Sequence, residues 1–118
     1  MDEAIQQFLS EKVNSFIKWD LVRFFHDTPH AKDTAPNIAR YIGRDQTTVE
    51  RELAALAQNG VVQAEQVAPD VTVYSLADDA DTRQTIHRFM AACHDRNFRV
   101  KVINQVIQAM QFTPSHDF

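Results

Sequence analysis

Residues 34–62, TAPNIARYIGRDQTTVERELAALAQNGVV, decide the fold, because they indicate two short helices joined by a tight turn and followed by a strand. Apolar side chains recur at helical spacing in both halves of this stretch. They are Ile38, Ala39 and Ile42 in the first half, and Val49, Leu53 and Leu56 in the second. The chain's only two glycines, Gly43 and Gly60, stand just after these two runs. Glycine adopts the left-handed conformation without steric cost, so both glycines predict helix C-termini.

The residues around this stretch predict the neighbouring elements. Residues 19–26 form an apolar helical segment that we expect to be the first of three core helices, and residues 30–33 form a polar loop. Thr34 is a suitable N-cap for a second helix over residues 35–42, and Asp45 for a third helix that continues to about residue 58. The β-prone runs 61–66 and 71–76 are separated by Ala68-Pro69-Asp70, which predicts a hairpin.

The order of these residues resembles the winged helix-turn-helix domain of MarR-type and ArsR-type bacterial regulators. The resemblance rests on Ile38-Ala39, Ile42-Gly43, Val49, Leu53, Leu56 and Asn59-Gly60-Val61-Val62, and it covers about residues 19–77. It implies a mainly α fold with a small β-hairpin wing, to which this chain adds N- and C-terminal helices. It also implies a DNA-binding transcriptional regulator that acts as a homodimer.

Amphipathic segments flank this core on both sides. Residues 2–17 carry an apolar stripe at helical spacing, and residues 81–110 carry a stripe that is interrupted at residues 94–97. The second segment is either one long helix or two helices that meet near Asp95. The terminal helices either pack on their own core or, as the resemblance implies, join in a dimer interface. The residues expected in that interface are Ile5, Phe8, Leu9, Val102, Val106, Ile107 and Met110.

In a helix-turn-helix, the third helix enters the major groove by its N-terminal end. Because Val49 and Leu53 face the core, the predicted DNA-binding residues are the outward-facing ones, together with the turn just before them. These residues are Arg44, Gln46, Thr47, Glu50 and Arg51. Gln pairs with adenine, Arg with guanine, Thr with a thymine methyl or a phosphate, and Glu with the cytosine amino group. The alternative is an ordinary solvated helix face.

The charge distribution favours a second function as well. The net charge is −4, and residues 35–76 contain three basic and five acidic residues, with no lysine or arginine in the wing. DNA-binding domains usually carry a basic footprint. The alternative function is therefore a winged-helix protein-interaction or assembly module without DNA binding. Residues 83–101 contain five basic residues and one acidic residue, Asp95. These basic residues either form a solvated helix face, contact phosphate, or complement acidic segments of a second subunit.

Other classes of function find little support in the sequence. His87, Cys93, His94 and Asp95 lack the spacing of a metal site, and no nucleophile with a base, catalytic carboxylate pair or glycine-rich cofactor loop is present. We therefore predict no catalytic residues, no metal and no cofactor. No apolar run approaches the ~20 residues that cross a bilayer, and the single cysteine fits a reducing compartment, so we expect a cytoplasmic protein. Residues 1–111 are expected to form one domain and residues 112–118 a flexible tail.

Overall fold

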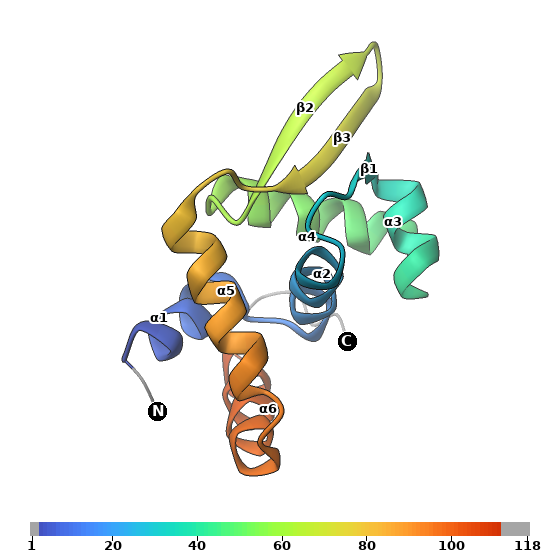
Figure 1. Cartoon of the computed structure of the whole chain (residues 1–118). Coiled ribbons are helices and arrows are strands. Elements are labelled where there is room, and N and C mark those ends of the chain that lie inside the picture. The colour runs from blue at the N-terminus through green and yellow to red at the C-terminus, as the bar shows by residue number, and fades with distance from the viewer. Residues whose placement is uncertain (1–2, 112–118) are drawn as a thin grey trace.

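The chain folds into six helices and one small antiparallel sheet in the part that the computed structural model describes, residues 3–111 (Figure 1). In chain order, the elements are α1 (Glu3–Lys12), α2 (Phe16–Asp27), β1 (Lys32–Thr34), α3 (Ala35–Ile42), α4 (Gln46–Gln58), β2 (Val62–Ala68), β3 (Val71–Leu76), α5 (Ala80–Ala92) and α6 (Arg96–Gln111). The expected mainly α fold with a small β-hairpin is confirmed at this level. The predicted tail at 112–118 lies outside the described residues.

Helices α3 and α4 begin and end where local capping chemistry predicts. α3 ends at Gly43, whose φ is +70°, and Gly60 after α4 has a φ of +77°. Both glycines therefore occupy the left-handed region that disfavours other residues. Asp45 is the N-cap of α4, because its carboxylate accepts a hydrogen bond from the Thr48 N–H at 3.0 Å. Thr34 precedes α3, but its side chain makes no capping hydrogen bond.

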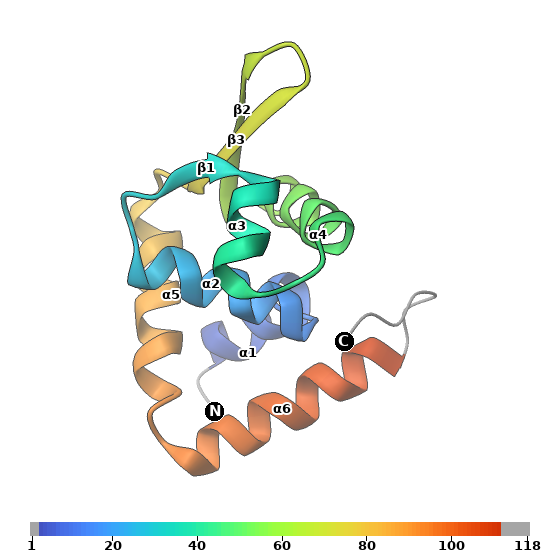
Figure 2. The same cartoon turned by 90° about the vertical axis from the view of Figure 1, so that its right-hand side faces the viewer.

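The sheet has the order β1-β3-β2 and is antiparallel throughout. The β2–β3 hairpin stands away from the helices in two views related by a quarter turn (Figure 2). Asp70 in its turn has a φ of +63°, a left-handed conformation that aspartate tolerates better than most residues. The prediction of a loop over residues 30–33 is wrong at its C-terminal end, because Lys32–Thr34 pairs with residues 73–75. Three residues are too few to show a period, so this edge strand is defined by its backbone partner.

The C-terminal segment is two helices, which decides between the two predicted alternatives. α5 ends at Ala92 and α6 begins at Arg96. Asp79 caps α5 by accepting from the Thr82 N–H at 2.9 Å. The Arg99 guanidinium donates to the Cys93 carbonyl at 2.7 Å, across the junction between the two helices. The acidic segment before α5 therefore works as a cap, as its charge near a helix N-terminus suggests.

One hydrophobic core contains residues from all six helices and from the hairpin. Phe89 of α5 is fully buried at its centre. Its ring contacts those of Phe8, Trp19 and Phe98 at centroid separations of 5.9, 6.1 and 6.3 Å. The terminal helices thus complete the core of the central helices, with α1 packed against both α5 and α6. None of the helices in residues 3–111 is long and apolar enough to cross a membrane.

The predicted dimer-interface residues are mostly used inside one chain. Six of them are buried in its core, and these are Ile5, Phe8, Leu9, Val102, Val106 and Met110. Ile107 differs, because 38% of it is exposed. The apolar stripes of α1 and α6 therefore cover each other and α5, which is the alternative in which the terminal helices pack on their own core.

Candidate nucleic-acid interface

The outward face of α4 carries four of the five predicted DNA-binding residues. Gln46, Thr47, Glu50 and Arg51 are all exposed. They lie on the solvent side of α4 because Val49 and Leu53 are fully buried on its other side. The Thr48 hydrogen bonds at the N-cap lower the pKa of Asp45, so this carboxylate stays charged at the helix start. Four residue types able to contact bases thus lie together on the first two turns of α4.

Arg44 is placed differently from the other four. It is half-buried and forms an ion pair with Asp20 of α2, with Nε and Nη2 lying 2.9 and 2.7 Å from the same carboxylate oxygen. Asp20 also accepts from Arg23 at 3.1 Å. Arg44 therefore ties the α3–α4 turn to α2. Sequence reasoning missed this role, because nothing in the sequence connects two residues that are 24 positions apart.

The opposite face of α4 is anchored by a second ion pair. Glu52 is buried and lies 3.1 Å from the Lys18 ammonium of α2, with the side chains 11% and 12% exposed. Its carboxylate also accepts from the Ser15 hydroxyl at 3.4 Å, and Lys18 donates to Asn14 at 2.7 Å. Buried charges in proteins are normally paired in this way. α4 is thus held to α2 by charge as well as by apolar contacts.

A shallow groove of about 300 Å³ separates α4 from the hairpin. The carboxyl side chains of Glu50 and Asp70 line it, with Gln46, Thr72 and Tyr74. Burial and the Glu50 charge raise the pKa of Tyr74, which keeps its hydroxyl neutral. The groove is therefore acidic where a nucleic-acid face is usually basic.

Lys32 lies on β1, the strand that pairs with the hairpin, and it is already paired with a carboxylate. Its ammonium on β1 lies 2.5 Å from the Glu65 carboxylate on β2. Both side chains are more than half exposed, so water screens this pair. The pairing nevertheless lowers the net positive charge that the hairpin side offers to phosphate.

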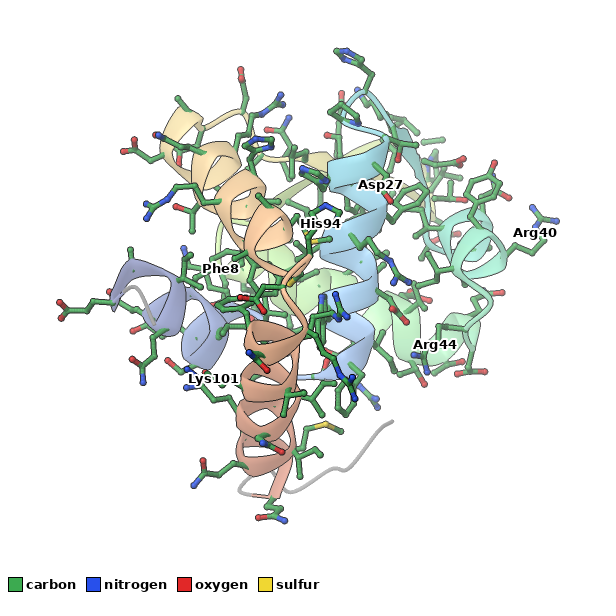
Figure 3. All side chains as sticks on the ribbon, turned by 60° about the horizontal axis from the view of Figure 1, so that its bottom comes forward. Phe8, Asp27, Arg40, Arg44, His94 and Lys101 are labelled. Carbon is green, nitrogen blue, oxygen red and sulfur yellow. The ribbon has the colours of Figure 1, made fainter. Side chains whose placement is uncertain are left out.

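The basic residues of the C-terminal helices lie away from α4. Figure 3 shows Lys101 and His94 on the α5–α6 side, whereas Arg40 and Arg44 lie on the side of α3. Two of these cations serve helix ends: Arg83 donates to the Ala77 carbonyl at 2.8 Å, and Arg99 to that of Cys93. This charge therefore does not add to the α4 face.

The residues weighed for a metal site do not converge. Within residues 3–111, no group of three or more His, Cys, Asp or Glu side chains is placed to hold a metal ion. Cys93 is buried, and burial raises its pKa to about 11. Its thiol is therefore protonated at neutral pH and is a poor ligand and nucleophile.

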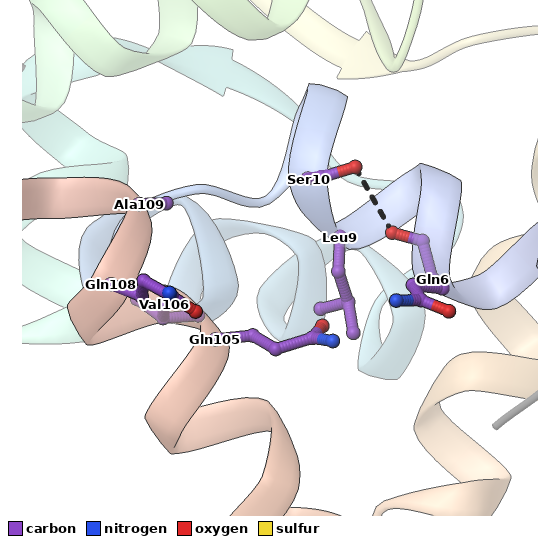
Figure 4. A pocket seen from close by; sticks show the side chains of 7 residues that line it. All are labelled: Gln6, Leu9, Ser10, Gln105, Val106, Gln108 and Ala109. Atoms are coloured by element: carbon purple, nitrogen blue, oxygen red, sulfur yellow. Dashed lines mark hydrogen bonds between the residues drawn. The ribbon is translucent and has the colours of Figure 1, made fainter. Parts of the chain in front are cut away.

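A second groove, of about 320 Å³, lies between α1 and α6 (Figure 4). Gln105 of α6 extends across it toward Leu9 of α1. Among the described residues, the Gln105 amide oxygen is buried without a hydrogen-bond partner. An unpaired buried acceptor costs on the order of 1–3 kcal/mol.

The α4 face can therefore pair with bases but offers little electrostatic attraction to DNA. Arg51 is the exposed arginine of this face, against the carboxylates of Glu50 and Asp70 in the adjoining groove. Comparison with known proteins finds no family model, no curated protein and no solved structure that matches this chain.

Proposed function

We propose that residues 16–77 are a winged helix-turn-helix module and that the protein is a DNA-binding transcriptional regulator acting as a homodimer. The element order supports this proposal: a helix, a short strand, two helices and a hairpin follow one another, and the short strand pairs with the second hairpin strand. The observation that carries the function is the exposed N-terminal half of α4, with Gln46, Thr47 and Arg51 beside a projecting hairpin.

In this function, α4 enters the major groove by its first two turns. Arg51 reads guanine, Gln46 reads adenine and Thr47 contacts a thymine methyl or a phosphate. Glu50 accepts from a cytosine amino group, which gives the acidic side of the groove a role in specificity. Arg44 positions the helix through Asp20 instead of reading a base.

The dimer is proposed to form through the exposed side of α6. Three of its large apolar residues, Val100, Ile103 and Ile107, are 49%, 38% and 38% exposed and recur at helical spacing. α6 has 16 residues and is therefore about 24 Å long, enough for a helix pair. A symmetric dimer presents two α4 helices to half-sites roughly 34 Å apart. Light scattering that shows a monomer at micromolar concentrations removes this part of the proposal.

The DNA proposal is tested by selection from random duplexes at low salt, followed by fluorescence anisotropy with the selected sequence. Arg51→Ala is expected to weaken binding at least ~10-fold and to relax the preference at one base pair, since a bidentate contact discriminates by about 1–3 kcal/mol. Lys101→Ala removes the same charge from the α6 side and is the matched control, with no such change in preference. If wild-type protein retains no DNA at low salt, the proposal fails.

A protein-interaction or assembly module is the second candidate, favoured by the acidic groove. Glu50 and Asp70 line the groove, and Lys32 and Arg44 are each paired with a carboxylate. Such a surface complements a basic segment of a protein partner. Glu50→Gln with Asp70→Asn separates the two candidates: the double variant strengthens nonspecific DNA binding if α4 binds DNA, and it weakens capture of a basic partner if the groove binds protein.

A further inference from the structure

The groove between α4 and the hairpin is formed by two regular elements. Gln46 and Glu50 are four residues apart and therefore share one side of α4. Thr72 and Tyr74 are two residues apart and therefore share one face of β3. Asp70 lines the groove from the hairpin turn. The volume of about 300 Å³ lies at the lower end of the range for small-molecule sites.

The described residues that line this groove include no cation, and all their polar side chains can accept hydrogen bonds. The six polar side chains are those of Thr34, Gln46, Glu50, Asp70, Thr72 and Tyr74. The three remaining lining residues are apolar. Ionised carboxylates can only accept, so the glutamate and the aspartate need donors from outside the wall. Such a wall complements a ligand that carries a positive charge and several N–H donors.

Tyr74 is the buried polar member of this wall, with 8% of it exposed. Burial and the charge of Glu50 raise the pKa of Tyr74, so its hydroxyl is neutral and able to accept a hydrogen bond. Among residues 3–111, this hydroxyl has no hydrogen-bond partner. The hydroxyl of a buried tyrosine usually has one. A donor bound in the groove supplies the missing partner.

Glu50 and Asp70 are not paired either. Within the described part of the chain, neither carboxylate forms an ion pair, whereas Glu52 and Glu65 each pair with a lysine. The N-terminus of α3 borders the groove, and its partial positive charge of about half an elementary charge opposes a cation. The N-terminus of α4 is already capped by the Asp45 carboxylate. Two full negative charges outweigh the α3 dipole, so the groove favours a cation.

We propose that this groove binds a small organic cation, an alkylguanidinium or a primary alkylammonium, through the carboxylates of Glu50 and Asp70 and the hydroxyl of Tyr74. The alkyl chain contacts the apolar lining at Pro36 and Val71. A metal ion does not suit this wall, since only two carboxylates line it and the described residues place no third His, Cys, Asp or Glu side chain with them.

The test is an NMR titration of the full chain with butylguanidinium up to about 10 mM, because a ligand of this size is expected to bind with a Kd of about 1 mM or lower. Saturable shifts are expected for the Gln46 side-chain amide, the Thr72 backbone amide and the Tyr74 ring. Butylurea has nearly the same shape without the charge, and it should bind at least ~10-fold more weakly. Equal affinities, or no saturable shift at these groups, overturn the proposal.

Conservative variants locate the bound cation. Glu50→Gln and Asp70→Asn should each weaken butylguanidinium binding about 10-fold or more, and Tyr74→Phe, which removes only the hydroxyl, about 5-fold. Glu65→Gln is the matched control, because this carboxylate lies on β2, is paired with Lys32 and does not line the groove. It should bind like the wild type. If Glu65→Gln weakens binding as much as Asp70→Asn, net charge alone holds the cation and the site is refuted.

A second probe identifies the source of the cation. A short peptide with one arginine carries the same head group as butylguanidinium. If the peptide binds at least ~10-fold more tightly, the groove recognises a protein segment, and the small-cation site is overturned in favour of the protein-interaction module. Because the titration contains no DNA, its failure leaves the DNA-binding proposal standing, and failure to retain DNA leaves the cation site standing.

Discussion

The Lys18–Glu52 pair gives the sharpest test of how α4 is held. Both side chains are about one-tenth exposed, so removing one partner leaves a buried, uncompensated charge. Such a loss costs about 3–5 kcal/mol. In Glu52→Leu, Lys18 keeps its 2.7 Å hydrogen bond to Asn14. We therefore expect the loss in free energy of unfolding to lie at the lower end of this range, about 3 kcal/mol. For a chain of this length, we expect the melting temperature to fall by about 10 °C.

The double variant separates the pair from its surroundings. Lys18→Met with Glu52→Leu replaces two buried charges by apolar groups, which is often neutral or stabilising. We expect it to lie within about 1 kcal/mol of the wild type, so the coupling energy is at least about 3 kcal/mol. The assay is urea unfolding of wild type, both single variants and the double variant. High salt should change the coupling little, because a buried pair is screened weakly.

Lys32–Glu65 is the matched control for this cycle. Its two charged atoms are 2.5 Å apart, against 3.1 Å for Lys18–Glu52, but its side chains are 52% and 60% exposed. Exposed pairs contribute about 0–1 kcal/mol. The same cycle with Lys32→Met and Glu65→Leu should therefore give a coupling below about 1 kcal/mol. Equal coupling energies for the two pairs would refute the reasoning, since burial would then not decide their strength.

Three further predictions concern single groups. The Cys93 thiol, whose pKa burial raises to about 11, should react with a disulfide reagent roughly two hundredfold more slowly in folded protein than in urea at about pH 8, because an unperturbed thiol has a pKa near 8.5. A rate ratio near unity would contradict this burial. Gln105→Leu should raise the free energy of unfolding by about 1 kcal/mol, because it removes a buried acceptor without a partner, and urea midpoints measure the change. Hydrogen bonds from Thr48 and Thr82 lower the pKa values of Asp45 and Asp79, so both carboxylates stabilise the fold above about pH 4, and that contribution is lost as the pH falls further. The variant Asp45→Ala/Asp79→Ala should therefore be less stable than wild type at neutral pH and should lose less stability on acidification, as followed by urea midpoints between neutral pH and strong acid.

Apolar spacing and capping residues were sufficient to predict most of the elements. The bounds of α3 follow from Ile38, Ala39 and the glycine at 43, because a helix buries one face and ends where the backbone can turn left-handed. The edge strand β1 was not predictable, since its residues pair through their backbone with a partner some 40 positions away. The stripe on α6 predicts burial, but an amphipathic pattern does not say whether α1 of the same chain or a second copy covers it.

The candidate site, too, could be predicted only in part. The exposed positions of α4 follow from its helical period, because Val49 and Leu53 point inward. The electrostatics of the site do not follow from it, since each ion pair joins residues far apart in sequence. Counting charges therefore gives the correct net value but does not reveal that Arg44 is neutralised by Asp20.

Helix α2 contacts both α4 and α5 through polar side chains. Lys18 binds the back of α4, Asp20 binds the turn before α4, and His26 meets α5. The first two contacts connect α2 to the proposed DNA-binding helix and its preceding turn, and the third connects α2 to the C-terminal helices. Because charged and hydrogen-bonded contacts are directional, a tilt of α2 cannot keep all three at their present distances. Any change at the α2–α5 contact that tilts α2 must therefore alter the placement of α4, whereas a change confined to α5 and α6 leaves it in place. Measuring DNA or partner binding by His87→Gln, which removes the His26 contact between α2 and α5, distinguishes these two cases.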